Sequence, residues 1–195
     1  MKKLESTGRD IFAKNISIIN FLCSVVNMLP EFVKRALWNL SFNVDSKFST
    51  LLRYCIISSI CKKVGRNVYI GPSVIIKNAR NLVIGDNVSI HFGCYIDAAG
   101  GCEIGSNVSI AHMSSIVTFE HTWNDLNLPI KYNPIRKKKV TVGDDVWVGC
   151  GVRILSGSCI SGRVVIAAGA VVTGNCESST LYGGVPARPL KPLAK

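Results

Sequence analysis

The phrase VGRNV at residues 64–68 recurs as IGDNV at 84–88, IGSNV at 104–108 and VGDDV at 142–146. The first three copies start 20 residues apart, and the fourth starts 38 residues after the third, which is one period plus an insertion of 18. Within each period an Ile or Val returns every six residues, at Val64, Ile70, Ile76, Ile84, Ile90, Ile96, Ile104, Ile110, Ile116, Val142, Val148, Ile154, Ile160, Ile166 and Val172. A fixed short period of this kind indicates a solenoid.

A six-residue unit is long enough for one short strand and one tight turn. Three units make a triangular coil, and stacked coils make a parallel prism in which β-branched side chains fill the interior. Glycine often follows the aliphatic position, at 65, 71, 85, 105, 143 and 149, which indicates a corner with unusual backbone dihedrals. An ordinary β-sandwich does not keep a strict six-residue register. We therefore predict a mainly β protein built as a parallel β-helix over residues 64–176.

The chain divides into three parts on this pattern. Residues 1–63 lack the repeat and form a predicted helical segment that caps the open end of the prism. The β-helix at 64–176 is interrupted by a loop excursion at 122–139, on the third and irregular side of the coil. Residues 177–195 contain three prolines and read as a non-regular C-terminal tail.

Two helices are expected inside the N-terminal segment. One starts at Pro30-Glu31, with an apolar face made of Phe32, Val33, Ala36, Leu37 and Leu40. The other runs from Leu51 to Lys63 and is capped by Ser49 or Thr50.

Positive charge dominates the chain, whose formal net charge is +11. Residues 1–63 carry ten Lys or Arg against four Asp or Glu. A basic excess favours an anionic partner, and no nucleic-acid-binding module is recognisable, so we expect no nucleic acid. The remaining candidates are a phosphorylated co-substrate and peripheral contact with an anionic membrane.

The eight cysteines are scattered and form no C-x-x-C pair. They are typical of small buried side chains in a reducing compartment, and neither zinc nor another metal is expected. The apolar run 16–29 contains four polar residues and precedes no signal-peptidase site, so no signal peptide or membrane span is expected. These features predict a cytoplasmic protein.

Three histidines could serve acid–base chemistry: His91, His112 and His121. His121 stands where the third coil breaks into the excursion, and functional groups are common on loops held by a rigid scaffold. An imidazole can take a proton from a hydroxyl at neutral pH. His121 is therefore the candidate general base, and a solvent-facing loop histidine is the alternative.

From residue 64 to 191 the chain resembles the hexapeptide-repeat acetyltransferases, and among them the galactoside, maltose and polysaccharide-assembly O-acetyltransferases. The resemblance rests on the repeat, on the place of His121, and on the phrases VWVG at 146–149, AAGAVVT at 167–173 and GVPAR at 184–188. It implies a left-handed β-helix, homotrimers with active sites between subunits, and acetyl-CoA as the acyl donor.

The resemblance also implies roles for single residues. The family's catalytic histidine falls on His121, and the acceptor contacts fall on His91 and Asp97. Its acetyl-CoA contacts fall on Trp147, Cys150, Ala168, Thr173, Arg188 and Lys191. An indole can form an apolar wall for the cofactor, two cations can meet its phosphates, and the backbone N–H at position 150 can face the thioester oxyanion. The chain departs from the sugar enzymes at His91, where they carry Asn, and at Gly174, where they often carry Lys.

The resulting prediction is an O-acetyltransferase that acts on a sugar hydroxyl in surface polysaccharide biosynthesis. An antibiotic hydroxyl is the alternative acceptor. Two alternatives of other classes are a carbonic-anhydrase-like metalloenzyme, which would bind zinc with three histidines, and a non-catalytic trimeric scaffold.

Overall fold

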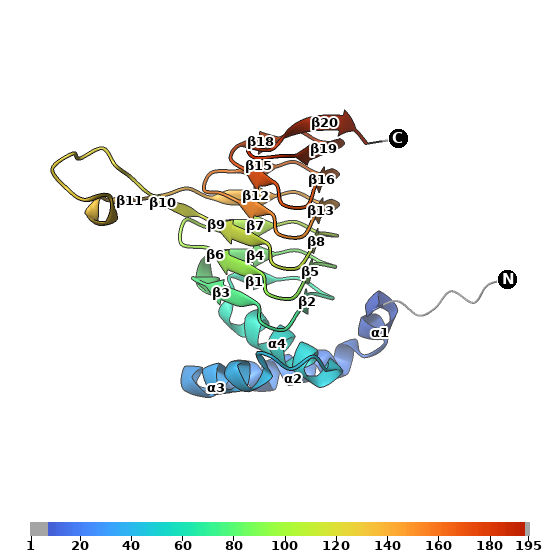
Figure 1. Ribbon diagram of the computed structural model, residues 1–195. Helices are drawn as coiled ribbons and strands as arrows, with labels where there is room; N and C mark the ends of the chain where they lie inside the picture. The colour runs from blue at the N-terminus through green and yellow to red at the C-terminus, as the bar shows by residue number, and fades with distance from the viewer. Residues whose placement is uncertain (1–7, 194–195) are drawn as a thin grey trace.

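The computed structural model describes residues 8–193, in which short strands wind into a left-handed parallel β-helix above a layer of helices (Figure 1). The first face of the prism consists of β1 (Lys63–Val64), β4 (Leu82–Ile84), β7 (Cys102–Ile104), β12 (Val140–Val142), β15 (Cys159–Ile160) and β18 (Asn175–Cys176). The second consists of β2 (Tyr69–Ile70), β5 (Ser89–Ile90), β8 (Ser109–Ile110), β13 (Val146–Val148), β16 (Val164–Ile166), β19 (Thr180–Gly183) and β20 (Arg188–Pro192). The third consists of β3 (Ile75–Lys77), β6 (Tyr95–Asp97), β9 (Ser115–Val117), β14 (Arg153–Ile154) and β17 (Val171–Val172). The predicted fold is confirmed.

The repeated aliphatic positions stack in one interior. Ile84, Ile104 and Val142 are aligned in adjacent parallel strands and are 0%, 1% and 3% exposed. Of the fifteen predicted positions, only Val64 and Ile76 are not fully buried, and both pack against the core in the first coil. The predicted register is therefore confirmed. This register is stabilised because each aliphatic side chain buries its surface against the equivalent side chains of the adjacent coils.

The corner between the first and second faces, called the first corner, explains the repeated phrase. Gly85 is required by close approach, because a Cβ there would lie 2.7 Å from the carbonyl carbon of Gly105. The unusual dihedrals occur two residues later, at Asn67, Asn87 and Asn107, whose φ values are 55° to 59°. The prediction that these glycines supply the unusual dihedrals is therefore wrong, since asparagine tolerates the left-handed region and takes that position.

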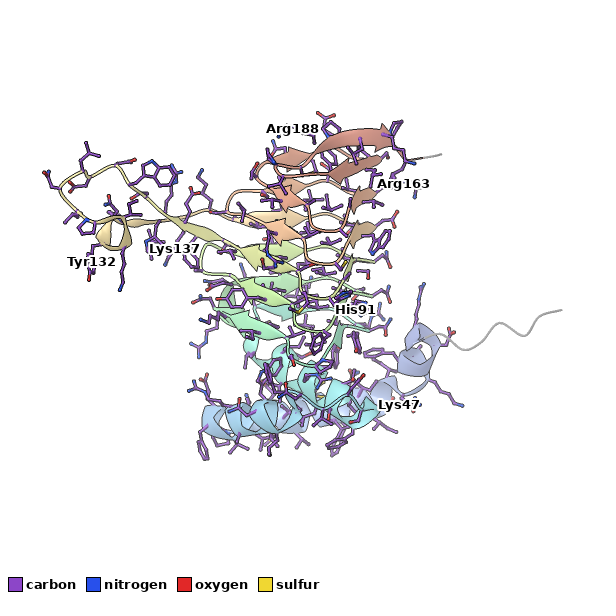
Figure 2. All side chains as sticks on the ribbon, in the orientation of Figure 1. Lys47, His91, Tyr132, Lys137, Arg163 and Arg188 are labelled. Carbon is purple, nitrogen blue, oxygen red and sulfur yellow. The ribbon has the colours of Figure 1, made fainter. Side chains whose placement is uncertain are left out.

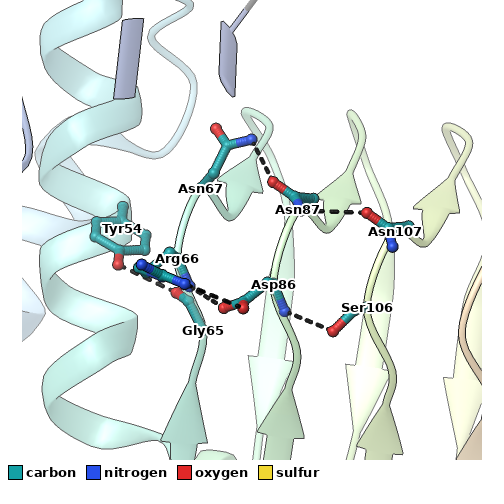
Figure 3. Close-up of polar contacts among 8 residues, drawn as sticks. All are labelled: Tyr54, Gly65, Arg66, Asn67, Asp86, Asn87, Ser106 and Asn107. Atoms are coloured by element: carbon teal, nitrogen blue, oxygen red, sulfur yellow. Dashed lines mark hydrogen bonds and ion pairs between the residues drawn. The ribbon is translucent and has the colours of Figure 1, made fainter. Parts of the chain in front are cut away.

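Asparagines at the first corner form a ladder (Figure 3). The Nδ2 of Asn67 donates to Oδ1 of Asn87 at 3.0 Å, and the Nδ2 of Asn87 donates to Oδ1 of Asn107 at 3.1 Å. Beside the ladder, the backbone N–H of Arg66 donates to Oδ1 of Asp86 at 2.6 Å. The polar residues of the phrase thus join successive coils.

Four helices form the layer at the start of the prism: α1 (Gly8–Lys14), α2 (Ile16–Met28), α3 (Glu31–Ser41) and α4 (Lys47–Ile60). α4 lies against the first coil, and its Cys55, Ile56 and Ile57 belong to the same core as the prism. Arg53 of α4 is fully buried, and its Nε donates to the carbonyl oxygen of Ile70 at 2.9 Å. This helix therefore covers the end of the prism.

Two details of the helices differ from expectation. The second predicted helix starts earlier, because Ser46 is its N-cap and accepts a hydrogen bond from the N–H of Ser49 at 3.1 Å. α3 begins at Glu31 as predicted, but its predicted apolar face is only partly inward, since Phe32 and Leu40 are each 75% exposed. Lys34 is buried in their place, and its Nζ donates to the carbonyl oxygen of Asn27 at 3.1 Å.

The chain leaves the prism at the third corner, between the third face and the next first face. The first coil has a short 3-10 helix there, η1 (Ala79–Asn81). The third coil sends out the excursion, whose base is an antiparallel ladder of β10 (Phe119–His121) with β11 (Ile135–Lys137), and whose far part contains η2 (Ile130–Tyr132) (Figure 1).

The C-terminal segment is regular, contrary to the expected non-regular tail. β19 continues the second face in parallel, and β20 pairs with β19 antiparallel, so the hairpin closes the far end of the prism. Within residues 8–193 no single helix is long and apolar enough to cross a membrane. α1 and α2 meet that measure together by length and composition, with a bend of 77° between them.

Candidate active site

His121 is the last residue of β10 and is held at the base of the excursion. It is paired with Ile135 of β11, and its side chain is exposed. The next residue, Thr122, donates from both its N–H and its hydroxyl to the carbonyl oxygen of Pro134, at 3.0 and 2.7 Å. The imidazole is therefore presented from the ordered base of the excursion.

The residues beside His121 reinforce that base. The Nε of Arg136 donates to Oε1 of Glu120 at 2.7 Å, across the same ladder. Sequence reasoning missed this pair. Opposite charges 16 residues apart carry no signal until the two strands are known to be antiparallel.

A second group of predicted site residues lies at the second corner, between the second and third faces. His112, Cys150 and Ala168 follow one another up this corner in successive coils. The N–H of Gly151 donates to the carbonyl oxygen of His112 at 3.0 Å, and the N–H of Gly169 donates to that of Cys150 at 2.8 Å. His91 lies on the same corner in the second coil, and its spacing of 21 from His112 equals one coil plus one position.

Trp147 stands beside this corner on the second face. It is on β13, between Ser109 and Val165 in the ladder, and its side chain is 56% exposed. A large exposed indole next to a corner offers an apolar wall to a ligand.

The backbone of β13 runs into the corner with one free donor. The N–H of Gly149 donates to Ile166 and that of Gly151 to His112. Between them, the N–H of Cys150 meets no acceptor among residues 8–193. A Cβ at Gly149 would lie 2.6 Å from the nitrogen of Ala168, so the close stacking of coils requires glycine there. An unpaired N–H at a partly exposed position can bind a developing oxyanion.

His91 titrates differently from a free imidazole. Burial lowers its pKa, and the neighbouring His112 lowers this pKa further. Its ring lies 5.6 Å from the ring of Tyr69, centroid to centroid. A lowered pKa keeps the imidazole neutral near pH 7, so that it can both donate and accept a hydrogen bond to a hydroxyl.

Asp97 ends β6 at the third corner and is 6% exposed. Its Oδ1 accepts hydrogen bonds from Nδ2 of Asn78 at 2.6 Å and from the N–H of Ala99 at 3.1 Å. Its carbonyl oxygen accepts from the hydroxyl of Thr118, just before the excursion. These contacts give Asp97 a structural role at the corner, and its predicted contact with an acceptor stays a prediction.

The remaining predicted cofactor contacts lie near the end of the prism. Thr173 is exposed at the third corner, in the fifth coil. Arg188 and Lys191 are exposed on β20, and no carboxylate among residues 8–193 lies within 4.0 Å of either cation (Figure 2). Both cations are thus available to an anion such as a phosphate.

One chain does not bring the two groups together. His91, Cys150 and Trp147 lie at or beside the second corner, whereas His121 and Thr173 lie at the third, with one whole face of the prism between them. His91 and the excursion residue Lys137 project from different sides of the prism (Figure 2). Among residues 8–193 no group of three or more His, Cys, Asp or Glu side chains could hold a metal ion.

Comparison with known proteins agrees with this architecture. The chain is 30% identical over 153 residues to the galactoside O-acetyltransferase of Escherichia coli, and the match covers 78% of this chain and 74% of that protein. The chain belongs to the hexapeptide-repeat acetyltransferases. No protein-family model matches it.

The chain is also similar to two further proteins. A probable acetyltransferase of Mycobacterium tuberculosis is 34% identical over 130 residues, covering 66% of this chain but only 43% of that longer protein. A solved galactoside acetyltransferase in complex with coenzyme A is 27% identical, with a TM-score of 0.74, and the match covers 84% of this chain and 80% of that one.

Proposed function

We propose that the protein transfers an acetyl group from acetyl-CoA to a hydroxyl of a sugar during the assembly of a surface polysaccharide. The observation that carries this proposal is the ordered, exposed His121 at the base of the excursion, in a hexapeptide-repeat acetyltransferase. The donor is supported by the solved relative that holds coenzyme A, and the acceptor class by the relative named for galactosides.

The chemistry assigned to His121 is proton removal. Its imidazole takes the proton of the acceptor hydroxyl as that oxygen attacks the thioester carbonyl carbon. A carbon–oxygen bond forms, the carbon–sulfur bond breaks, and the proton passes from the imidazolium to the departing thiolate. The free N–H of Cys150 is suited to bind the oxyanion of the tetrahedral intermediate.

Acyl transfer is proposed to be direct, without an acyl-enzyme. A cysteine nucleophile needs an accessible thiolate. Burial raises the pKa of the Cys55, Cys61 and Cys102 thiols to about 12 and that of Cys176 to about 11. These four thiols are therefore protonated at neutral pH.

We propose a homotrimer in which neighbouring chains share each site. The third corner of one chain would supply His121, and the second corner of the next would supply Trp147, Cys150 and His91. This arrangement is supported by the separation of the two corners within one chain. Closed cyclic symmetry repeats such a heterologous contact three times.

We also propose that the enzyme works at a membrane surface. Residues 1–63 carry a surplus of six positive charges, and each Lys or Arg near an anionic bilayer contributes about 1 kcal/mol of attraction.

An acceptor screen tests the activity. Purified protein and acetyl-CoA are incubated with mono- and oligosaccharides and with hydroxyl-bearing antibiotics, and the release of free thiol is followed. Sugar-dependent release that is lost in His121→Ala is the expected result. A higher kcat/KM for the antibiotics would favour detoxification instead, and no release with any acceptor would contradict the proposal.

A further inference from the structure

The helical layer has an inner and an outer side, and α4 defines them. From Ser49 to Ile60 every residue of α4 is buried or half-buried, because the helix lies between the prism and the helices α2 and α3 (Figure 1). The sides of α2 and α3 that point away from α4 therefore point away from the prism.

α2 carries apolar residues both on its packed side and on an exposed stripe next to that side. Its inner side packs into the core through Ile19 and Val26, with Leu22 and Cys23 beside them. Its outer side carries Ile18, Phe21, Val25 and Met28, which are 43–86% exposed. Their spacing of three, four and three residues places them on one stripe of the helix. The core does not require this stripe.

The helices α3 and α4 expose three more large apolar side chains. Phe32 and Leu40 of α3 are each 75% exposed, and Phe48 at the start of α4 is 74% exposed. The seven residues, called here the basal apolar face, are Ile18, Phe21, Val25, Met28, Phe32, Leu40 and Phe48. Exposed apolar patches of this kind mark interaction surfaces.

Charge decides which partner fits. Lys14, Arg35 and Lys47 are exposed on the same layer, where Figure 2 shows Lys47. The layer also exposes three acidic residues, Asp10, Glu31 and Asp45, so residues 8–60 carry six Lys or Arg against three Asp or Glu. Glu31 is paired with Arg80, whose Nη2 lies 2.7 Å from Oε1. A second copy of this chain would oppose one basic face to another, which costs electrostatic repulsion, whereas an anionic lipid surface is complementary.

We propose that the basal apolar face inserts into the headgroup region of an anionic bilayer, with the prism standing away from the membrane. Apolar side chains enter the boundary between headgroups and acyl chains, and the flanking cations contact the lipid phosphates. The inference deepens the proposed work at a membrane surface and rests on it. It adds burial of named apolar side chains, so binding does not depend on charge alone.

In the proposed trimer, three basal apolar faces would bind the membrane more strongly than one. If the three prisms stand parallel, their basal faces point the same way and meet one flat surface together. Linked binding of this kind raises avidity by roughly 10²–10⁴-fold over a single face.

Vesicle sedimentation of the full chain tests the proposal. The vesicles are phosphatidylcholine with about 30 mol % phosphatidylglycerol, at salt of about 0.05 M and about 0.5 M. The variant Phe21→Gln/Met28→Gln should bind the vesicles more weakly than wild type, by about tenfold or more. Leu126→Gln on the excursion removes a side chain that is 93% exposed, and should bind like wild type. Light scattering confirms that each variant keeps the same oligomeric state.

Each result supports or overturns the basal apolar face as a bilayer-inserting surface. Equal loss of binding in Phe21→Gln/Met28→Gln and in Leu126→Gln would overturn it. If salt releases wild type completely and Phe21→Gln/Met28→Gln binds normally, charge alone holds the protein at the membrane and the insertion is wrong. If wild type associates beyond the trimer and the double variant does not, the face joins copies of the chain. Acetyl transfer to a soluble sugar is measured separately, so failure of the enzymatic proposal is distinguishable.

Discussion

His121 is paired with Ile135 in the antiparallel ladder that closes the base of the excursion. The imidazole therefore sits on an ordered element that projects from a rigid prism. A general base needs a fixed position relative to its substrate, so this placement supports the proposed role of His121.

His121→Ala should lower kcat by roughly 10²–10⁴-fold, which is the usual contribution of a positioned general base. Binding of coenzyme A, measured by calorimetry, should be nearly unchanged, because the proposed cofactor contacts lie at other positions. Near-normal turnover in this variant, or an acetylated cysteine found during turnover, would contradict the mechanism.

Trp147→Ala should raise the KM for acetyl-CoA by about tenfold with a smaller change in kcat, because loss of an apolar wall weakens ground-state and transition-state binding alike. Initial-rate kinetics at saturating acceptor measure the effect. An unchanged KM would return Trp147 to a packing role on the outside of the prism.

Sharing of the site between chains predicts complementation. His121→Ala and Trp147→Asp should each be inactive alone, and trimers reassembled from an equal mixture should have both residues intact at about a quarter of the sites. Activity of the mixture is the measurement. A matched mixture of His121→Ala with His121→Ala/Trp147→Asp should stay inactive, and the idea fails if both mixtures behave alike.

Arg53→Met should destabilise the junction between helices and prism. The guanidinium donates to the carbonyl oxygens of Ile70, Ser41 and Val44, and burial lowers its pKa. Removing it leaves buried acceptors without a donor, at a cost of roughly 3 kcal/mol. The Tm should fall by about 10 °C.

The control for that experiment is Arg80→Met, which breaks the exposed ion pair with Glu31. Exposed pairs contribute little, so its Tm should stay close to that of wild type. Equal melting of both variants would mean that Arg53 does not hold the layer in place.

The lowered pKa of His91 predicts a small loss of stability at mildly acidic pH, because this side chain is exposed to solvent. Below the unfolded-state pKa of about 6.5 the unfolded chain binds more protons at this residue than the folded chain, so stability falls as pH drops toward the folded pKa. His91→Asn should lose less Tm than wild type between neutral and mildly acidic pH. If the Tm of wild type and of His91→Asn falls equally over that pH range, His91 is not the cause of the loss of stability.

The coil register could be predicted because it is a local property. Every six residues the chain must place one aliphatic side chain inside, and this requirement can be counted without knowing any contact. The excursion was visible for the same reason, as a break in the count. The tail at 180–192 was misread, because its prolines suggested irregular structure while the free edge of β19 accepts a partner strand.

The sequence predicted the individual residues of the candidate site but not their arrangement in space. His91 and His121 carry the same chemistry in the sequence, and nothing local reveals that a whole face of the prism separates them. Asp97 was predicted to contact the sugar acceptor. The sequence could not show that its carboxylate accepts hydrogen bonds from Asn78 and Ala99.

The sequence by itself determined the β-helix, its register, the place of the excursion and the candidate base at His121, because each depends on a period that neighbouring residues set. Only the tertiary structure decided which sides of α2 and α3 are covered, that Phe32 and Leu40 remain exposed, and that one chain holds its functional groups at two corners. The physical reason is that the burial of a side chain depends on what packs against it, and α4 covers only one side of each helix that it contacts.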